Sequence, residues 1–270
     1  GNIDGDGDIN LIAQVIAVGD LAAGGSISAD ATVGDASFGT VNAAENITID
    51  AAGTPRLVSA ISGGDTDITG ASVALSNGDV GGNLSLDATS GNVDANGAIT
   101  VGGGIDLDAT GDVSFGNLDA QGGTFTVDAD GNIDFVEARS SDDMAMNAGG
   151  GISGGRAMSD GAGLFNADNE LTLDNADIAD SAAFAGSNVQ LGAISGSSIA
   201  VSGSNVSVQN ANGGDITIMG DDISINLADG DNIALTSAGN GSIAANRVDA
   251  SGTIDLVAGT GGFAGGTLSS

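Results

Sequence analysis

The chain lacks several residue types that common functional sites require. It has no cysteine, histidine, tryptophan or tyrosine, and its four basic residues are all arginines. The absence of cysteine excludes disulfide bonds and thiolate metal sites. Without histidine, lysine or tyrosine, most of the usual general acids and bases are missing. We therefore predict no catalytic residues and expect that the protein is not an enzyme.

Positive charge is also scarce. The sequence has 36 acidic and four basic residues, for a net charge of −32. Nucleic acids and anionic membranes both need a basic footprint on the protein, so neither is an expected partner. The most apolar run, residues 9–18, falls well short of the roughly 20 apolar residues of a membrane span, so we predict no membrane insertion.

Proline and aromatic residues are rare, whereas glycine and aspartate are abundant. There are 48 glycines and one proline, and all acidic residues except Glu45, Glu137 and Glu170 are aspartates. Aspartate and glycine favour turns and disfavour helix interiors. Apolar residues still make up 41 % of the chain, which argues for an ordered core rather than disorder. The composition is typical of a β protein rich in turns.

A short phrase recurs along the chain: an apolar residue, any residue, a second apolar residue, then a small or acidic one. It reads ITIDA at 47, LSLDA at 84, IDLDA at 105, FTVDA at 125 and MAMNA at 144. Looser copies are LTLDN at 171, VQLGA at 189, VSVQN at 206, ISINL at 223 and IDLVA at 254. Within these runs the step between copies is about 17 to 21 residues, and such a period indicates a solenoid.

Each copy predicts a short strand whose alternate side chains face a core, and one or two further short strands follow within the period. We therefore predict an all-β, right-handed parallel β-helix with 17–21 residues per coil and three short strands per coil. Residues one coil apart become neighbours in such a fold. Phe115 should then stack on Phe135, and Phe165 on Phe184.

The repeat predicts one solenoid over residues 1–270, interrupted twice. Residues 53–72 contain the only proline, and residues 149–169 stretch one unit to 27 residues, so we expect a loop insertion at each place. A solenoid needs polar capping units, and neither end of the sequence has a convincing one. The chain is therefore expected to be a segment or a subunit of a longer fibre.

The repeat units resemble those of very large bacterial surface proteins, the filamentous haemagglutinin-type adhesins of two-partner secretion. GGIDLDATGDVSFGNLDAQGG (103–123) is the clearest passage. The resemblance covers most of the chain and implies a secreted protein that folds as a right-handed β-helix and acts in cell-surface or matrix fibres. The amino-terminal secretion domain of those adhesins has no clear match here.

One set of aspartates is a candidate calcium site. If the coils stack, Asp87, Asp108 and Asp128 fall in one outward column. Carboxylates about 5 Å apart repel one another, and Ca²⁺ bridging between coils would remove the repulsion, since hard oxygen ligands suit this ion. The alternative is a solvated acidic face screened by salt. Both interpretations stay open, and no other cofactor is predicted.

The first ten residues, GNIDGDGDIN, suggest a second metal site. Asp4, Asp6 and Asp8 stand at alternate positions with Gly5 and Gly7 between them, as in a calcium loop. An EF-hand loop beginning at Asn2 would need a bidentate glutamate where Ala13 stands, so the match is poor.

These observations predict an extracellular structural or adhesive fibre protein at a bacterial surface or in a matrix. Its expected partners are further copies or repeats of itself, joined end to end, and cell-surface glycans or proteins. One alternative is a calcium-stabilised surface-layer or adhesin module. A second is a β-helical polysaccharide-active enzyme, which would need an ordered groove with convergent carboxylates.

Overall fold

The computed structural model describes all residues from 1 to 270, and the chain contains strands and turns but no helix. It is a right-handed parallel β-helix, as predicted. The chain divides into two compact units, Gly1–Asp142 and Asp143–Ser270, which are described separately. None of its elements is a long apolar helix of the kind that spans a bilayer.

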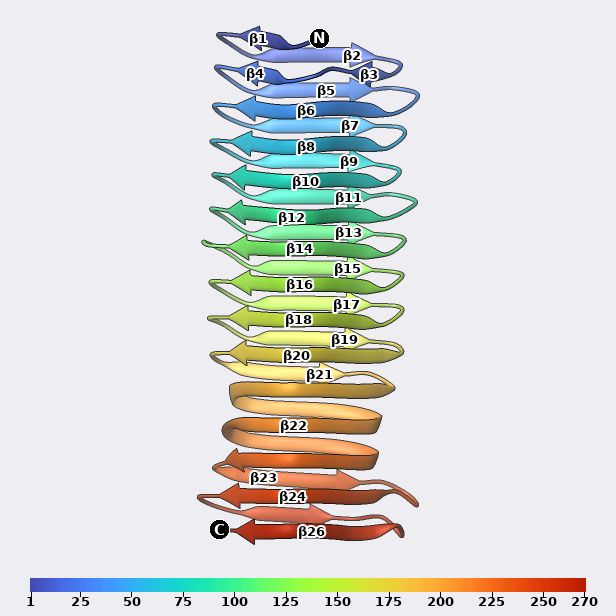
Figure 1. The fold of residues 1–270 in the computed structure, drawn as a ribbon, viewed down its shortest axis with the longest axis vertical. Helices are drawn as coiled ribbons and strands as arrows, with labels where there is room; N and C mark the ends of the chain where they lie inside the picture. Colours follow the sequence, from blue (N-terminus) through green and yellow to red (C-terminus); the bar gives the residue numbers. More distant parts are fainter. The chain divides into compact units, whose positions relative to one another are not determined.

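Each coil of the first unit contains one short strand and one long strand, and the two kinds alternate along the chain (Figure 1). The short strands are β2 (Ile9–Ala13), β5 (Ile27–Ala31), β7 (Ile47–Ala51), β9 (Thr66–Gly70), β11 (Leu84–Ala88), β13 (Ile105–Ala109) and β15 (Phe125–Ala129). The long strands are β6 (Ala36–Ala43), β8 (Pro55–Ser62), β10 (Val73–Val80), β12 (Val93–Val101), β14 (Val113–Ala120) and β16 (Ile133–Ser140). The first coils contain the short pieces β1 (Ile3–Gly5), β3 (Ile16–Ala17) and β4 (Leu21–Ala23).

The alternating pattern explains the short strands. In β13, Ile105, Leu107 and Ala109 are buried, while Asp106 and Asp108 point outward. This strand pairs in parallel with β11 and β15, and every inward residue meets an inward residue one coil away. Apolar columns therefore line the core of the unit, as expected where residues alternate along stacked strands.

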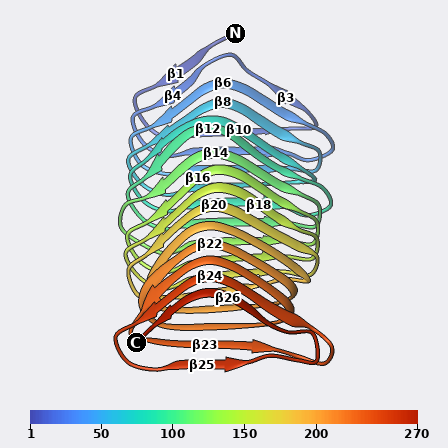
Figure 2. The same cartoon turned by 60° about the horizontal axis from the view of Figure 1, so that its bottom comes forward.

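The long strands contain the second and third strands that the sequence predicts for each coil. In β14, Phe115 and Leu118 both point inward, and the residues between them, Gly116 and Asn117, mark a bend. The separate strands β3 and β4 both pair with the single strand β6, which shows the same two halves. Figure 2 shows the long strands as arches, so each covers two faces of its coil.

The second unit has the same plan. Its short strands are β17 (Met144–Ala148), β19 (Gly163–Ala167), β21 (Ser181–Ala185), β23 (Asn232–Ser237) and β25 (Ile254–Val257). Its long strands are β18 (Ile152–Ser159), β20 (Glu170–Ile178), β24 (Ser242–Ala250) and β26 (Gly262–Ser269). Between β21 and β23 the strand β22 (Asn188–Gly230) winds without a break through several turns (Figure 1).

The predicted aromatic stacks are confirmed in both units. The ring centroids of Phe115 and Phe135 lie 5.1 Å apart, with 10° between the ring planes. Phe165 and Phe184 stack at 5.2 Å, also with 10° between the planes. Phe125 adds a tilted contact to Phe115 at 5.6 Å. Each stack spans one coil, because the spacing of the phenylalanines equals the coil length.

The predicted loop insertion at residues 53–72 is wrong. Strands β8 and β9 occupy this stretch and pair in register with the coils on either side. The repeat is hard to see there because Thr66 takes an inward position that is apolar in other coils. Thr66 is 1 % exposed, and its hydroxyl lies 2.8 Å from that of Ser62, so the buried polar groups satisfy each other.

The loop insertion at residues 149–169 is wrong for a related reason. Strands β18 and β19 fill most of the stretch, and the coil from β17 to β19 has the ordinary length. Gly163 stands at the inward position, and a Cβ there would overlap the side chains of Ile178 and Phe165. The larger neighbours therefore fill the space that an apolar residue takes elsewhere.

The later copies of the repeat phrase also lie on a different strand from the earlier ones. The copies at 171, 189, 206 and 223 belong to long strands, since Leu171 pairs with Ile152 of β18 and Ile223 pairs with Ile243 of β24. The copies at 47 to 144 and at 254 belong to short strands. The unit that seemed to have 27 residues was counted from a short strand to a long one.

Candidate functional site

The predicted aspartate column is present on the outer side of the short strands of the first unit. Asp87 pairs in register with Asp108, and Asp108 pairs with Asp128. The column begins earlier than predicted, with Asp30 beside Asp50. Thr69 interrupts it between Asp50 and Asp87.

A second acidic column runs beside the first one and was not predicted. It contains Asp67 and Asp106, separated by Ser85, which pairs with both. Thr126 continues this column, and its hydroxyl donates a hydrogen bond of 2.9 Å to Asp106. The sequence signal was the residue between the two apolar positions of each phrase, which is acidic only in some copies.

The crowded carboxylates affect the titration of two aspartates. Partial desolvation raises the pKa of Asp108 above its ordinary value, and the charges of Asp87, Asp128, Asp106 and Asp130 raise it further. The pKa of Asp67 is raised by desolvation and by Asp87 and Asp50, against a hydrogen bond from Ser85 that lowers it. The acidic columns therefore store like-charge repulsion in the folded state.

The carboxylates of these columns do not form a cluster. No group of three or more acidic side chains converges so that it could hold a metal ion, either at Asp87, Asp108 and Asp128 or elsewhere in the chain. The columns lie along the strands, one carboxylate per coil, instead of around a point. Calcium binding between coils stays a prediction.

The aspartates of the first ten residues have different environments from one another. The Asp8 carboxylate accepts a hydrogen bond of 2.8 Å from the backbone N–H of Ser26 in the next coil. Asp4 lies in β1 beside Ala22, and Asp4, Asp6 and Asp8 form no group that could hold a metal. The calcium-loop pattern in the sequence corresponds to a corner of the first coil.

The bond of Asp8 belongs to a series at one corner of the coils. There, a side-chain oxygen accepts a hydrogen bond from the backbone N–H of a residue in the next coil. This bond satisfies a donor that the strands leave unpaired. The pairs are Asp8 with Ser26, Asn46 with Asp65, Asp65 with Asn83, and Asn83 with Gly104. These asparagines and aspartates stabilise the coil and need no ligand to explain them.

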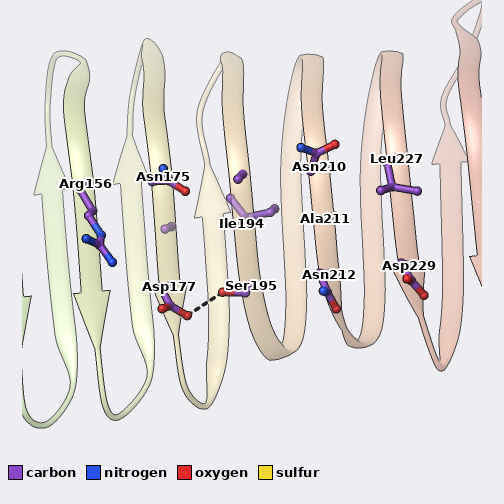
Figure 3. A pocket seen from close by; sticks show the side chains of 12 residues that line it. Arg156, Asn175, Asp177, Ile194, Ser195, Asn210, Ala211, Asn212, Leu227 and Asp229 are labelled. Carbon is purple, nitrogen blue, oxygen red and sulfur yellow. Dashed lines mark hydrogen bonds between the residues drawn. The ribbon is translucent and has the colours of Figure 1, made fainter.

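A polar groove of about 440 Å³ lies on the long strands of the second unit (Figure 3). Its lining combines the guanidinium of Arg156, the amides of Asn175, Asn210 and Asn212, and the carboxylates of Asp177 and Asp229. Ser195 donates a hydrogen bond of 2.7 Å to Asp177 across neighbouring coils.

The groove exists because one small residue interrupts a column of larger ones. Ala193 pairs with Asn175 and leaves a gap in the outward column that contains Arg156 and Asn175. Arg156 is exposed and forms no ion pair with a carboxylate of the second unit. The groove thus offers donors and acceptors to a polar ligand. It was not predicted, because the sequence pattern does not show which outward residues share a face.

Comparison of the chain with protein-family models, with curated proteins and with solved structures finds no match in any of the three.

Proposed function

We propose that the chain is an extracellular structural or adhesive fibre protein that acts by multivalent contacts and by end-to-end assembly. The proposal rests on the coil repeat, on the acidic surface and on the strand edges at the two ends of the chain. Resemblance of the repeat units to filamentous haemagglutinin-type adhesins supports the same function.

The observation that carries the proposal is the exposure of apolar residues whose partners in the neighbouring coil are buried. Phe263 and Leu268 of β26 pair with Ile243 and Val248 of β24. Ile243 and Val248 are fully buried, whereas Phe263 is 40 % and Leu268 is 46 % exposed. A further coil stacked on β26 would bury both side chains and pair the free backbone edge, which is the usual way in which open strand edges associate.

The opposite end has the same property. Ile3 of β1 is 36 % exposed, although its partner Leu21 is fully buried. The coil that covers such an edge is either a further repeat of the same chain or another copy. Because the two ends present different surfaces, contacts between copies are head to tail and do not close on themselves.

The fibre is expected to contact cell-surface glycans or proteins with its sides. The polar groove on the second unit supports this role, since its amides, carboxylates and guanidinium suit a ligand with many hydroxyl groups. Each copy of the chain in a fibre adds one such groove, so weak contacts would add up.

Electron microscopy of the purified chain tests the proposal. We expect unbranched filaments of uniform width that form at micromolar concentration. A Phe263→Asp, Leu268→Asp double variant should remain as single particles, whereas a matched pair of changes on the side of a coil should not prevent filaments. Single particles of the unchanged chain at all concentrations would refute end-to-end assembly of copies.

A calcium-stabilised surface module is the second candidate, because the register of Asp87, Asp108 and Asp128 places three carboxylates side by side. Calcium should then raise the melting temperature, and a chelator should lower it. A melting temperature that is the same with Ca²⁺ and with chelator would eliminate this candidate.

A further inference from the structure

The outer side of the short strands in the second unit carries almost no charge. We call this surface the neutral face: the outward residues of β17, β19, β21, β23 and β25, and of the two passes of β22 at residues 198–202 and 215–220. Its only acidic residues are Asp215, at the start of the second of these passes of β22, and Asp255, on β25. In the first unit, the corresponding side of the short strands carries the two acidic columns.

The neutral face exposes large apolar side chains among small ones. Leu164 is 45 %, Met219 is 50 % and Val257 is 51 % exposed. Apart from Asp215 and Asp255, the remaining outward residues are alanine, serine, threonine and asparagine. Large exposed apolar side chains on a surface with so little charge favour an interaction with another protein surface, because their burial is favourable.

The register fixes where the large and small residues stand. Ala145 is the first residue of one column and Asp255 the seventh, with Leu164 second and Ala234 sixth. In the neighbouring column, Ala185 is third and Met219 is fifth. Ala200 stands at the middle of its column.

We propose that the neutral face binds the same face of a second copy of this chain, around a two-fold axis through Ala200. In that arrangement position two meets position six, and position three meets position five. Leu164 therefore packs against Ala234 of the second copy, and Met219 packs against Ala185. Leu164 and Met219 thus each meet an alanine, as in interdigitated sheet packing, and Val257 meets Asn147.

Charge opposes a second copy less on this face than over the acidic columns of the other short strands. Two chains of net charge −32 repel each other wherever their carboxylates meet. On the neutral face no carboxylate directly opposes another: the two copies of Asp255 lie at opposite ends of the contact, each against Ala145, and Asp215 of each copy meets Ser181 of the other. An isologous dimer needs such a self-complementary surface.

The size of the face sets the strength of the contact. Strands about 4.8 Å apart and about 17 Å long give a total buried area of about 1,100 Å² for the two copies. This area lies at the lower end of specific interfaces, so the dimer is weak and reversible. Added salt strengthens it, because screening reduces the repulsion between the two acidic chains. The contact is lateral, and it goes beyond the end-to-end contact proposed above.

Cross-linking tests the arrangement, because the chain has no cysteine of its own. An Ala200→Cys variant places the two thiols across the two-fold axis, within reach of a short bismaleimide if the sheets are about 10 Å apart. An Ala145→Cys variant is the matched control on the same face, since its two thiols lie at opposite ends of the contact. A Ser224→Cys variant is the control on a long strand.

We expect Ala200→Cys to form cross-linked dimers at least tenfold faster than either control variant. Adding Met219→Asp to Ala200→Cys should slow the reaction at least tenfold, and Leu164→Asp should do the same, while Ser224→Asp should not. Equal rates for Ala200→Cys and Ala145→Cys, or no effect of either aspartate, would overturn the proposal. Filaments seen by microscopy test the ends of the chain, so failure of the lateral contact leaves that result unchanged.

Discussion

Replacement of Asp108 by asparagine should stabilise the protein. Asp108 lies between Asp87 and Asp128 in the longer acidic column. Desolvation raises the pKa of Asp108, and the charges of these two neighbours raise it further. Asparagine keeps the size of the side chain and removes the charge. The substitution therefore isolates the repulsion that the stacked carboxylates exert on one another.

The magnitude follows from the register. Carboxylates on neighbouring parallel strands are about 5 Å apart, where two unit charges in water repel by about 0.8 kcal/mol. A Debye length of about 8 Å at physiological ionic strength roughly halves this value. Two neighbours then contribute about 1 kcal/mol, which corresponds to a melting temperature about 2–4 °C higher. In about 0.01 M salt the gain rises toward 1.5 kcal/mol, because screening nearly disappears.

Asp79→Asn is the matched control. Asp79 is also outward and exposed, but its neighbours in register are Ile61 and Thr100, which carry no charge. Thermal unfolding followed by circular dichroism, with chelator present and at several salt concentrations, gives the comparison. If Asp108→Asn is no more stabilising than Asp79→Asn at low salt, the carboxylates of the column do not repel as the structure implies.

Three further predictions concern pH, the core and the corners. Because the folded-state pKa values of Asp67 and Asp108 are raised, these groups destabilise the fold near neutral pH, and the penalty falls as the pH drops through the raised values toward the ordinary value of 3.8. The stability gain of an Asp67→Asn, Asp108→Asn double variant should therefore shrink on acidification, and a gain that is constant with pH would contradict this. Phe115→Ala should cost about 3–5 kcal/mol in urea unfolding, since the ring packs on both Phe125 and Phe135; a loss below 1 kcal/mol would show that the stack is not formed. Gly97→Ala should destabilise by about 1–3 kcal/mol, because its Cβ would overlap the carbonyl oxygen of Ser76, whereas Gly7→Ala meets no atom and should be nearly neutral.

Much of the fold could be predicted from the sequence because a coil has a nearly constant length. Inward residues recur at that length, so the phenylalanines 115 and 135 could be assigned to one stack before the structure was known. The same argument placed Asp87, Asp108 and Asp128 in one column. Register is well determined wherever inward positions are apolar, since a shift by one residue would expose them.

The sequence could not show which strand a phrase belongs to. Short and long strands both read as apolar, any, apolar, so the copies at 171 to 223 seemed to continue the column of 144 although they lie on long strands. The repeat phrase could not be recognised in the two short strands that contain Thr66 and Gly163, so the shift of the phrase from short to long strands could not be seen in the sequence. For the same reason the acidic side of the first unit and the neutral face of the second unit could not be told apart.

Diffraction from aligned filaments of the purified chain tests the central claim most directly. If copies join end to end with their coils in continuous register, a strong reflection at about 4.8 Å should lie on the meridian, parallel to the filament axis. A filament that gives this reflection perpendicular to its axis, or a chain that forms no filaments at all, would contradict end-to-end assembly through the open coils.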